Sequence, residues 1–144
     1  MIIAVDFDGT VVSDDRPYND LETPLEFMPG AKEALTSIKA AGHILLLYSA
    51  RNNGVLIGDD PSVDPLHRAG VRRRTQTPEN RQLNIARYEQ MVNFVNEELP
   101  GIFDAIDDGK QGKPSAHVYI DDKAISYAPY QGWDWKTIAG IYGD

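Results

Sequence analysis

Four apolar runs along the chain have the composition of buried β-strands. They cover residues 2–7, 43–49, 102–106 and 117–121, of which 102–106 is the weakest. Uninterrupted runs of Ile, Val and Leu are typical of strands covered on both faces, as in a parallel sheet. The first run is interrupted only by Asp6. The pattern therefore predicts a buried sheet of parallel strands.

Two segments between these runs have the periodicity of amphipathic helices. The first spans about residues 30–41, after Pro29 and before Gly42, which are typical helix boundaries. Its apolar stripe consists of Ala31, Ala34, Leu35, Ile38 and Ala41. The second spans about residues 79–98, with a stripe of Ile85, Tyr88, Val92, Val95 and Leu99. Alternating strands and helices predict an open α/β sheet.

Length and composition narrow the class of protein. The 144 residues carry a formal net charge of −8 and no cysteine. An acidic chain is poorly suited to nucleic acid or an anionic membrane, and no apolar run approaches the length of a membrane span. The lack of cysteine excludes a thiol nucleophile and Cys-ligated metals. We expect one cytoplasmic domain, residues 1–144, in which residues 51–78 form a long loop or a small lid.

Polar side chains close each of the apolar runs. They are Asp6, Asp8, Ser49, Asp107, Asp108, Asp121 and Asp122. In an open α/β sheet, ligands bind outside the carboxyl ends of the strands. Carboxylates that meet at this rim repel one another unless a hard cation lies among them, and Mg²⁺ prefers such oxygen ligands together with a substrate phosphate. The sequence therefore predicts a magnesium site at the carboxyl edge.

The spacing of Asp6 and Asp8 suits phosphoryl transfer, because residues two apart on a strand point to the same side. Asp6 is placed to attack phosphorus and form an aspartyl phosphate. Asp8 is placed to protonate the leaving oxygen and then to deprotonate water. Gly9 permits a tight exit from the strand. Ser49 and a lysine are expected to bind the transferring phosphoryl oxygens.

These segments resemble the ordered motifs of the haloacid dehalogenase-like (HAD) superfamily. Residues 3–11, Ile-Ala-Val-Asp-Phe-Asp-Gly-Thr-Val, are similar to motif I in its phosphatase form. Residues 44–49 are similar to motif II, an apolar strand that ends in Ser or Thr. Lys113 matches the lysine of motif III, and residues 118–122 resemble the acidic motif IV. All four occur in the superfamily's order over about residues 2–123.

The resemblance implies a fold and an activity. The fold is a Rossmann-like open parallel sheet with helices on both faces. The activity is Mg²⁺-dependent hydrolysis of a phosphomonoester. Residues 11–29 and 51–78 are too short for the large cap domain that many members insert at these places. We therefore expect a capless or minimally capped enzyme, whose substrate the sequence does not identify.

The resemblance also assigns a role to each matching residue. Asp6 becomes nucleophile and metal ligand, and Asp8 becomes general acid/base and a metal ligand through its backbone carbonyl. Asp121 and Asp122 complete the metal site. The ligands of the substrate phosphate are Ser49 and Lys113, and Arg51, two residues past Ser49, is expected to assist them.

Two of these assignments have competitors within the sequence. Lys113 is preferred over Lys110 because Lys113 directly precedes Pro114, an abrupt start of an element. The acidic pair 121–122 is preferred over 107–108 because it follows the lysine and a stronger apolar run. For residues 107–108, a turn before Gly109 is the simpler interpretation.

The sequence leaves several alternatives for the substrate and the partner. A small phosphorylated metabolite or a nucleotide is the first expectation. An open site and four arginines, Arg68, Arg72, Arg73 and Arg74, would also suit the phosphorylated end of a nucleic acid, although a solvated basic face is the simpler interpretation. A third possibility is a regulatory or interaction module that keeps the metal site with little turnover.

Two groups of residues are expected to be structural. His43, His67 and His117 lack the spacing of metal ligands. Trp133 and Trp135 are expected to pack the C-terminal tail onto the sheet or its helices.

Overall fold

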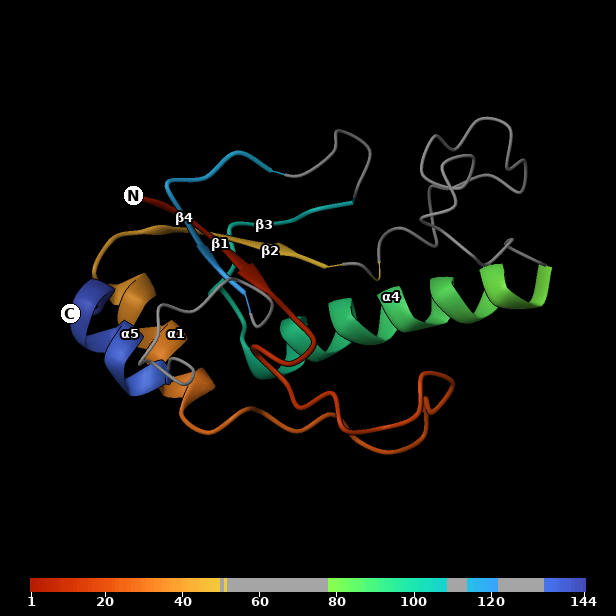
Figure 1. Ribbon diagram of the computed structural model, residues 1–144. Coiled ribbons are helices and arrows are strands. Elements are labelled where there is room, and N and C mark those ends of the chain that lie inside the picture. The colour runs from red at the N-terminus through yellow and green to blue at the C-terminus, as the bar shows by residue number, and fades with distance from the viewer. Residues whose placement is uncertain (50, 52–77, 109–113, 122–133) are drawn as a thin grey trace, which may run out of the picture.

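The computed structural model describes residues 1–49, 51, 78–108, 114–121 and 134–144, with only the backbone of 78–81. Its sheet has four parallel strands in the order β3-β2-β1-β4 (Figure 1). These strands are β1 (Ile2–Asp6), β2 (Ile44–Tyr48), β3 (Ala105–Ile106) and β4 (Val118–Ile120). All four predicted runs therefore form strands, and the predicted α/β class is confirmed.

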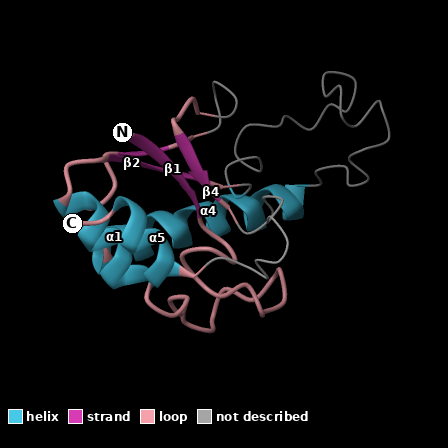
Figure 2. Ribbon diagram, turned by 60° about the vertical axis from the view of Figure 1, so that its left-hand side comes forward, coloured by secondary structure: helices cyan, strands magenta, loops and turns pink. Residues whose placement is uncertain are grey.

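One face of the sheet forms the hydrophobic core. Ile3 and Val5 of β1 lie beside Leu45 and Leu47 of β2, and all four are fully buried. The helices α1 (Ala31–Ala40), α4 (Pro78–Glu98) and α5 (Trp135–Tyr142) lie on this side (Figures 1 and 2). Both crossovers, β1-α1-β2 and β2-α4-β3, step in the same direction along the sheet. Right-handed crossovers then place α1 and α4 on the same face.

For the opposite face of the sheet, the expectation of covering helices stays a prediction. Ile44 is 47% exposed and Tyr119 is 37% exposed on that face. Among the described residues, no helix covers it. The connection from β3 to β4 contains residues 109–113, which lie outside the described part of the chain.

Helix α1 follows its predicted stripe. Ala31, Ala34, Leu35 and Ile38 are buried against the sheet, whereas Ala41 is an exposed cap residue just past the helix. Gly42 ends the segment with φ of 89°, a left-handed conformation that a residue without Cβ adopts without strain. The boundary that the sequence predicted there is confirmed.

Helix α4 is rotated relative to its predicted stripe. Met91, Val95 and Leu99 are buried in the core and Tyr88 packs against it, while Ile85 and Val92 stay outside the core cluster. Phe94, which was not part of the predicted stripe, explains the difference. Its ring contacts those of Phe7 and Phe27 at centroid distances of 6.0 and 5.0 Å. These contacts turn the helix toward the loop that follows β1.

The C-terminal segment forms a helix that the sequence analysis did not predict. Asp134 caps α5 by accepting a hydrogen bond from the backbone N–H of Thr137 at 2.7 Å. Trp135 is buried, as expected for tail packing, and its indole N–H donates to the carbonyl of Thr10 at 2.8 Å. This bond ties the end of the chain to the turn after β1. Trp133 lies outside the described residues.

Candidate active site at the carboxyl edge of the sheet

Three predicted site residues lie at the carboxyl ends of adjoining strands. Asp6 ends β1, Ser49 follows β2, and Asp121 follows β4. The register pairs Asp6 with Tyr48, and Val5 with Ile120. The three side chains therefore start from the same level of the sheet, with β1 in the middle.

A tight turn leads the chain out of β1 and carries Asp8. Gly9 has φ of 76°, as the sequence analysis expected of a glycine at the strand exit. The carbonyl of Phe7 accepts the backbone N–H groups of Thr10, Val11 and Val12 at 2.9–3.2 Å. The chain then makes a loop over residues 13–28, which contains no helix and is closed where Val12 bridges Phe27. We call it the 13–28 loop.

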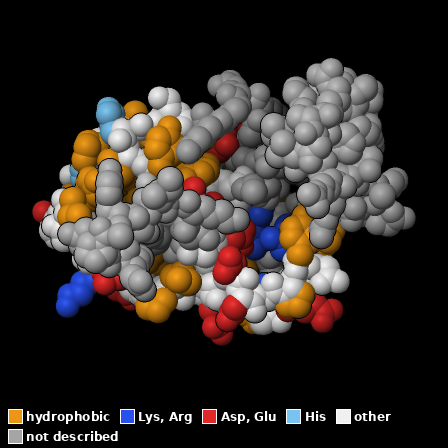
Figure 3. All heavy atoms as spheres, in the orientation of Figure 1, with side chains coloured by type: hydrophobic (Ala, Val, Ile, Leu, Met, Phe, Trp, Pro, Cys, Tyr) orange, Lys and Arg blue, Asp and Glu red, His pale blue; other side chains and the backbone are white. Residues whose placement is uncertain are grey.

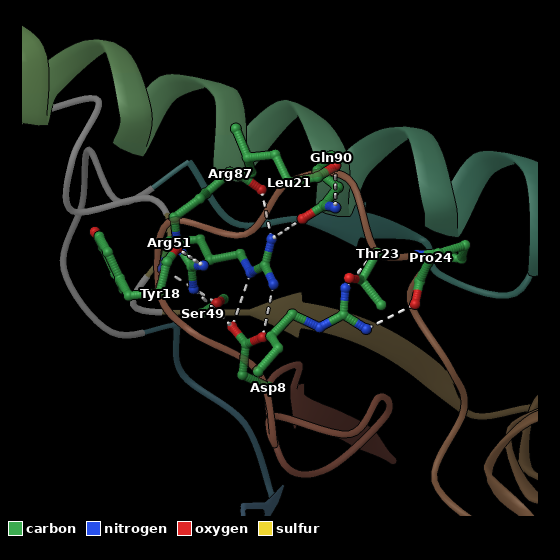
Figure 4. Close-up of polar contacts among 10 residues, drawn as sticks. Asp8, Tyr18, Leu21, Thr23, Pro24, Ser49, Arg51, Arg87 and Gln90 are labelled. Carbon is green, nitrogen blue, oxygen red and sulfur yellow. Dashed lines mark hydrogen bonds and ion pairs between the residues drawn. The ribbon is translucent and has the colours of Figure 1, made fainter.

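Asp8 forms a bidentate ion pair with Arg51. Arg51 Nε donates to Oδ2 at 2.8 Å and Nη2 donates to Oδ1 at 2.7 Å (Figure 4). The Arg51 side chain is only 2% exposed, while that of Asp8 is 28% exposed. A desolvated pair with parallel N–H···O bonds is the strong form of this interaction. Basic and acidic side chains also adjoin near the middle of the face seen in Figure 3.

Helix α4 and a phenyl ring hold the rest of the Arg51 guanidinium. Its Nη1 donates to the carbonyl of Arg87 at 2.8 Å and to Gln90 Oε1 at 3.0 Å. Its carbon atom Cζ lies 5.1 Å from the centroid of the Phe7 ring. Most of its N–H donors thus have protein acceptors, so the expected contact of Arg51 with a substrate phosphate stays a prediction.

Arg87 is a second cation at Asp8 that the sequence analysis missed. Its Nη2 lies 4.0 Å from Asp8 Oδ2, and its Nη1 donates to the carbonyl of Tyr18 at 2.7 Å. The guanidinium stacks over the Tyr18 ring at 4.1 Å. Burial and the charge of Arg51 lower the pKa of Arg87. Arg87 is a single arginine on a helix and belongs to no motif, so nothing in the sequence indicates that it lies beside Asp8.

Tyr48 links the strand ends on the other side of β1. Its hydroxyl donates to Asp121 Oδ2 at 2.7 Å. Burial raises the pKa of the Tyr48 phenol, and so do its hydrogen bond to Asp121 and the negative charges of Asp121 and Asp6. Both carboxylates therefore lie close enough to act on one hydroxyl. The signal that could have identified Tyr48 is its register opposite Asp6, immediately before Ser49.

Ser49 is 5% exposed, and its Oγ accepts the backbone N–H of Arg51 at 3.1 Å. This bond orients the oxygen and leaves the hydroxyl proton to donate. Lys113 and Asp122 lie outside the described residues, as do Lys110 and residues 68–74.

The position of the two acidic pairs in the sheet favours the one at 121–122. Asp121 follows β4, which adjoins β1, whereas Asp107 and Asp108 follow β3, with β2 between it and β1. Residues 107 and 108 lie near helix α4, where their charges add to burial in raising the pKa of Tyr88.

The donor set at Asp6 and Asp121 fits a hard divalent cation. Carboxylate and carbonyl oxygens are the ligands that Mg²⁺ takes, often only one or two carboxylates with water and substrate phosphate. The register of β1 with β4 puts Asp6 and Asp121 at the ends of adjoining strands. Within the described part of the chain, no group of three or more His, Cys, Asp or Glu side chains is close enough to form a metal site by itself.

Comparisons with models of protein families, with curated proteins and with solved structures gave no match. In the described ranges, no helix has both the length and the apolar character needed to cross a membrane. The functional assignment of this edge therefore depends on its residues and their geometry.

Proposed function

We propose that the protein is a Mg²⁺-dependent phosphomonoester hydrolase of the HAD-like type, which acts through an aspartyl phosphate on Asp6. The observation that carries the proposal is the arrangement of Asp6, Asp8, Ser49 and Asp121 at the carboxyl edge of adjoining parallel strands. In open α/β sheets this edge is where ligands bind.

The reaction has two displacements at phosphorus. In the first, an Asp6 carboxylate oxygen bonds to phosphorus, the ester P–O bond breaks, and Asp8 gives a proton to the leaving oxygen. In the second, water attacks the phosphorus of the aspartyl phosphate while Asp8 takes a proton from that water. The bond between Asp6 and phosphorus then breaks, which releases inorganic phosphate and restores both carboxyl groups.

The contacts of Asp8 suit this double task. Each carboxylate oxygen has two acceptor sites, and Arg51 occupies one on each oxygen. The Asp8 side chain is 28% exposed, so the proton or the water molecule would reach its other acceptor sites, while the ion pair fixes the plane of the carboxylate. Ser49 donates its hydroxyl proton to a phosphoryl oxygen, and Lys113 is proposed as the second phosphate ligand.

Asp6, the backbone carbonyl of Asp8 and Asp121 would hold the metal, with Asp122 beside them. When bound, Mg²⁺ neutralises the charge that develops on the phosphoryl oxygens. The substrate is proposed to be a small phosphorylated metabolite or a nucleotide. Between β1 and α1 the chain has only the loop over residues 13–28 and its short flanks, so no large cap domain is inserted there.

The proposal is tested by phosphate release from a panel of phosphomonoesters, with Mg²⁺ and with a chelator. The panel contains sugar phosphates, nucleotides, phospho-amino acids and a 3′-phosphorylated oligonucleotide. We expect chelator-sensitive turnover that Asp6→Asn reduces by at least about 10³-fold, since such a change removes the nucleophile. Asp104→Asn is the matched control, because Asp104 lies at the opposite edge of the sheet beside Leu45. Full activity of Asp6→Asn, or an equal loss in both variants, would contradict the proposal.

A further inference from the structure

The geometry points to Gln90 as a positioning residue that sets the direction of Asp8 through Arg51. The inference rests on the proposed function, in which Asp8 is the general acid and base. It begins from the way in which α4 contacts the guanidinium (Figure 4).

The Arg51 guanidinium is a rigid planar fork, so holding one corner fixes the direction of the others. Asp8 occupies the side formed by Nε and Nη2. The remaining nitrogen, Nη1, bonds to Gln90 Oε1 at 3.0 Å and to the carbonyl of Arg87 at 2.8 Å. The Phe7 ring lies against the guanidinium at 5.1 Å. Of these contacts, the hydrogen bond that Arg51 donates to Gln90 is the polar one that a side-chain substitution removes.

The amide orientation of Gln90 is determined by its partners. Its Oε1 must face Arg51, which has only donors. Its Nε2 then faces the carbonyl of Leu21 in the 13–28 loop, at 3.5 Å. Gln90 therefore touches the loop on one side and the partner of Asp8 on the other.

Asn84, on the same helix, provides a matched control. Its Oδ1 accepts the hydroxyl of Tyr18, so it also contacts the 13–28 loop. Among the described residues it has no contact with Arg51 or Asp8. A variant at Asn84 removes a hydrogen bond to the loop and none to Arg51 or Asp8, and this separates the two roles that Gln90 combines.

The experiment compares Gln90→Met, Gln90→Glu and Asn84→Leu in the full chain, with p-nitrophenyl phosphate and phenyl phosphate as substrates. Phenolate is the poorer leaving group and needs the proton from Asp8 more. We expect Gln90→Met to lower kcat for phenyl phosphate about tenfold more than for p-nitrophenyl phosphate at nearly unchanged KM, since small misplacements of a catalytic group cost up to about 10²-fold. Gln90→Glu keeps the acceptor oxygen and is expected to restore the wild-type ratio, while Asn84→Leu leaves the ratio unchanged. Equal losses on both substrates would overturn the inference.

A second measurement does not require turnover. The Arg51 Nε–H proton, observed by ¹⁵N NMR, should exchange with solvent at least about tenfold faster in Gln90→Met than in wild type or Asn84→Leu, because a loosened ion pair exposes it. Unchanged exchange in Gln90→Met overturns the inference even if no panel substrate is hydrolysed. Faster exchange in a protein without phosphatase activity supports the positioning role and contradicts the proposed function.

Discussion

The two edges of the sheet each contain an ion pair of the same length, in different surroundings. At the carboxyl edge, Arg51 meets Asp8 at 2.7 Å with side chains 2% and 28% exposed. At the amino edge, Lys39 meets Asp104 at 2.7 Å with side chains 29% and 39% exposed. Distance alone therefore does not distinguish them.

The other contacts at each edge distinguish the two ion pairs. At the amino edge, side chains satisfy the backbone groups where strands begin: Asp104 accepts the N–H of Leu45, and His117 accepts the N–H of Ile2. At the carboxyl edge, the charged side chains of Arg51 and Arg87 both contact the carboxylate of Asp8. The amino edge supports the fold. The carboxyl edge concentrates charge at one place, as a site for chemistry does.

The largest expected effect is that of Arg51→Met on stability. The change leaves Asp8, Gln90 Oε1 and the carbonyl of Arg87 without their shared donor. Breaking a buried ion pair from one side costs 3–5 kcal/mol, and the partial exposure of Asp8 reduces this to about 3 kcal/mol. Urea unfolding at pH 7 measures it. A loss below about 1 kcal/mol would mean that the two edges are energetically alike.

Tyr48→Phe is expected to act on metal binding and only slightly on the fold. The variant keeps the ring but removes the hydrogen bond that orients Asp121. Loss of such a partner weakens metal affinity by about tenfold or more, which calorimetric titration with Mg²⁺ detects. Tyr119→Phe is the control, because the Tyr119 hydroxyl donates to the carbonyl of Pro114. Equal affinities in wild type and Tyr48→Phe would remove Asp121 from the proposed metal site.

The smallest effect is expected for Asp104→Asn, and it depends on pH. The hydrogen bond from Lys39, and then that from the Leu45 N–H, hold the pKa of Asp104 below its ordinary value of 3.8. A lowered folded-state pKa stabilises the fold above the unfolded-state value, and this contribution is lost as pH falls through the folded-state value. Exposed pairs contribute about 0.2–1 kcal/mol. The difference in unfolding free energy between wild type and variant should be constant from pH 7 to about 5 and decline below 3.8; a difference that grows there would contradict this assignment.

The strands and the first helix could be predicted because their signals are local. An apolar run interrupted only by Asp6 predicted β1, and the stripe from Ala31 to Ile38 predicted α1. Helix α5 was missed because it is short and its burial depends on contacts with distant residues, among them Trp135 with Thr10 and Tyr142 with His43. The face of α4 was partly wrong because Phe94 and Met91 compete with Val92 for the core, which only the packed rings of Phe7 and Phe27 decide.

The candidate site shows the same division. Asp6, Asp8, Ser49 and Asp121 could be selected from the sequence because they follow apolar runs, and the structure brings them to one edge. Arg87 and Gln90 could not, since their relevance comes from partners far away in the chain. The pairing of Arg51 with Asp8 could not be predicted either, because the place of Arg51 in the sequence made a substrate phosphate an equally good partner.

The strand order has a consequence for how the protein is made. β1 leaves the ribosome first, yet one of its two neighbours is β4, whose residues are synthesised more than a hundred positions later. Until then β1 presents an unpaired edge of apolar residues, the kind of surface that recruits other chains. The nascent chain is therefore expected to need chaperone protection until β4 has been made, and Asp121 joins Asp6 only then.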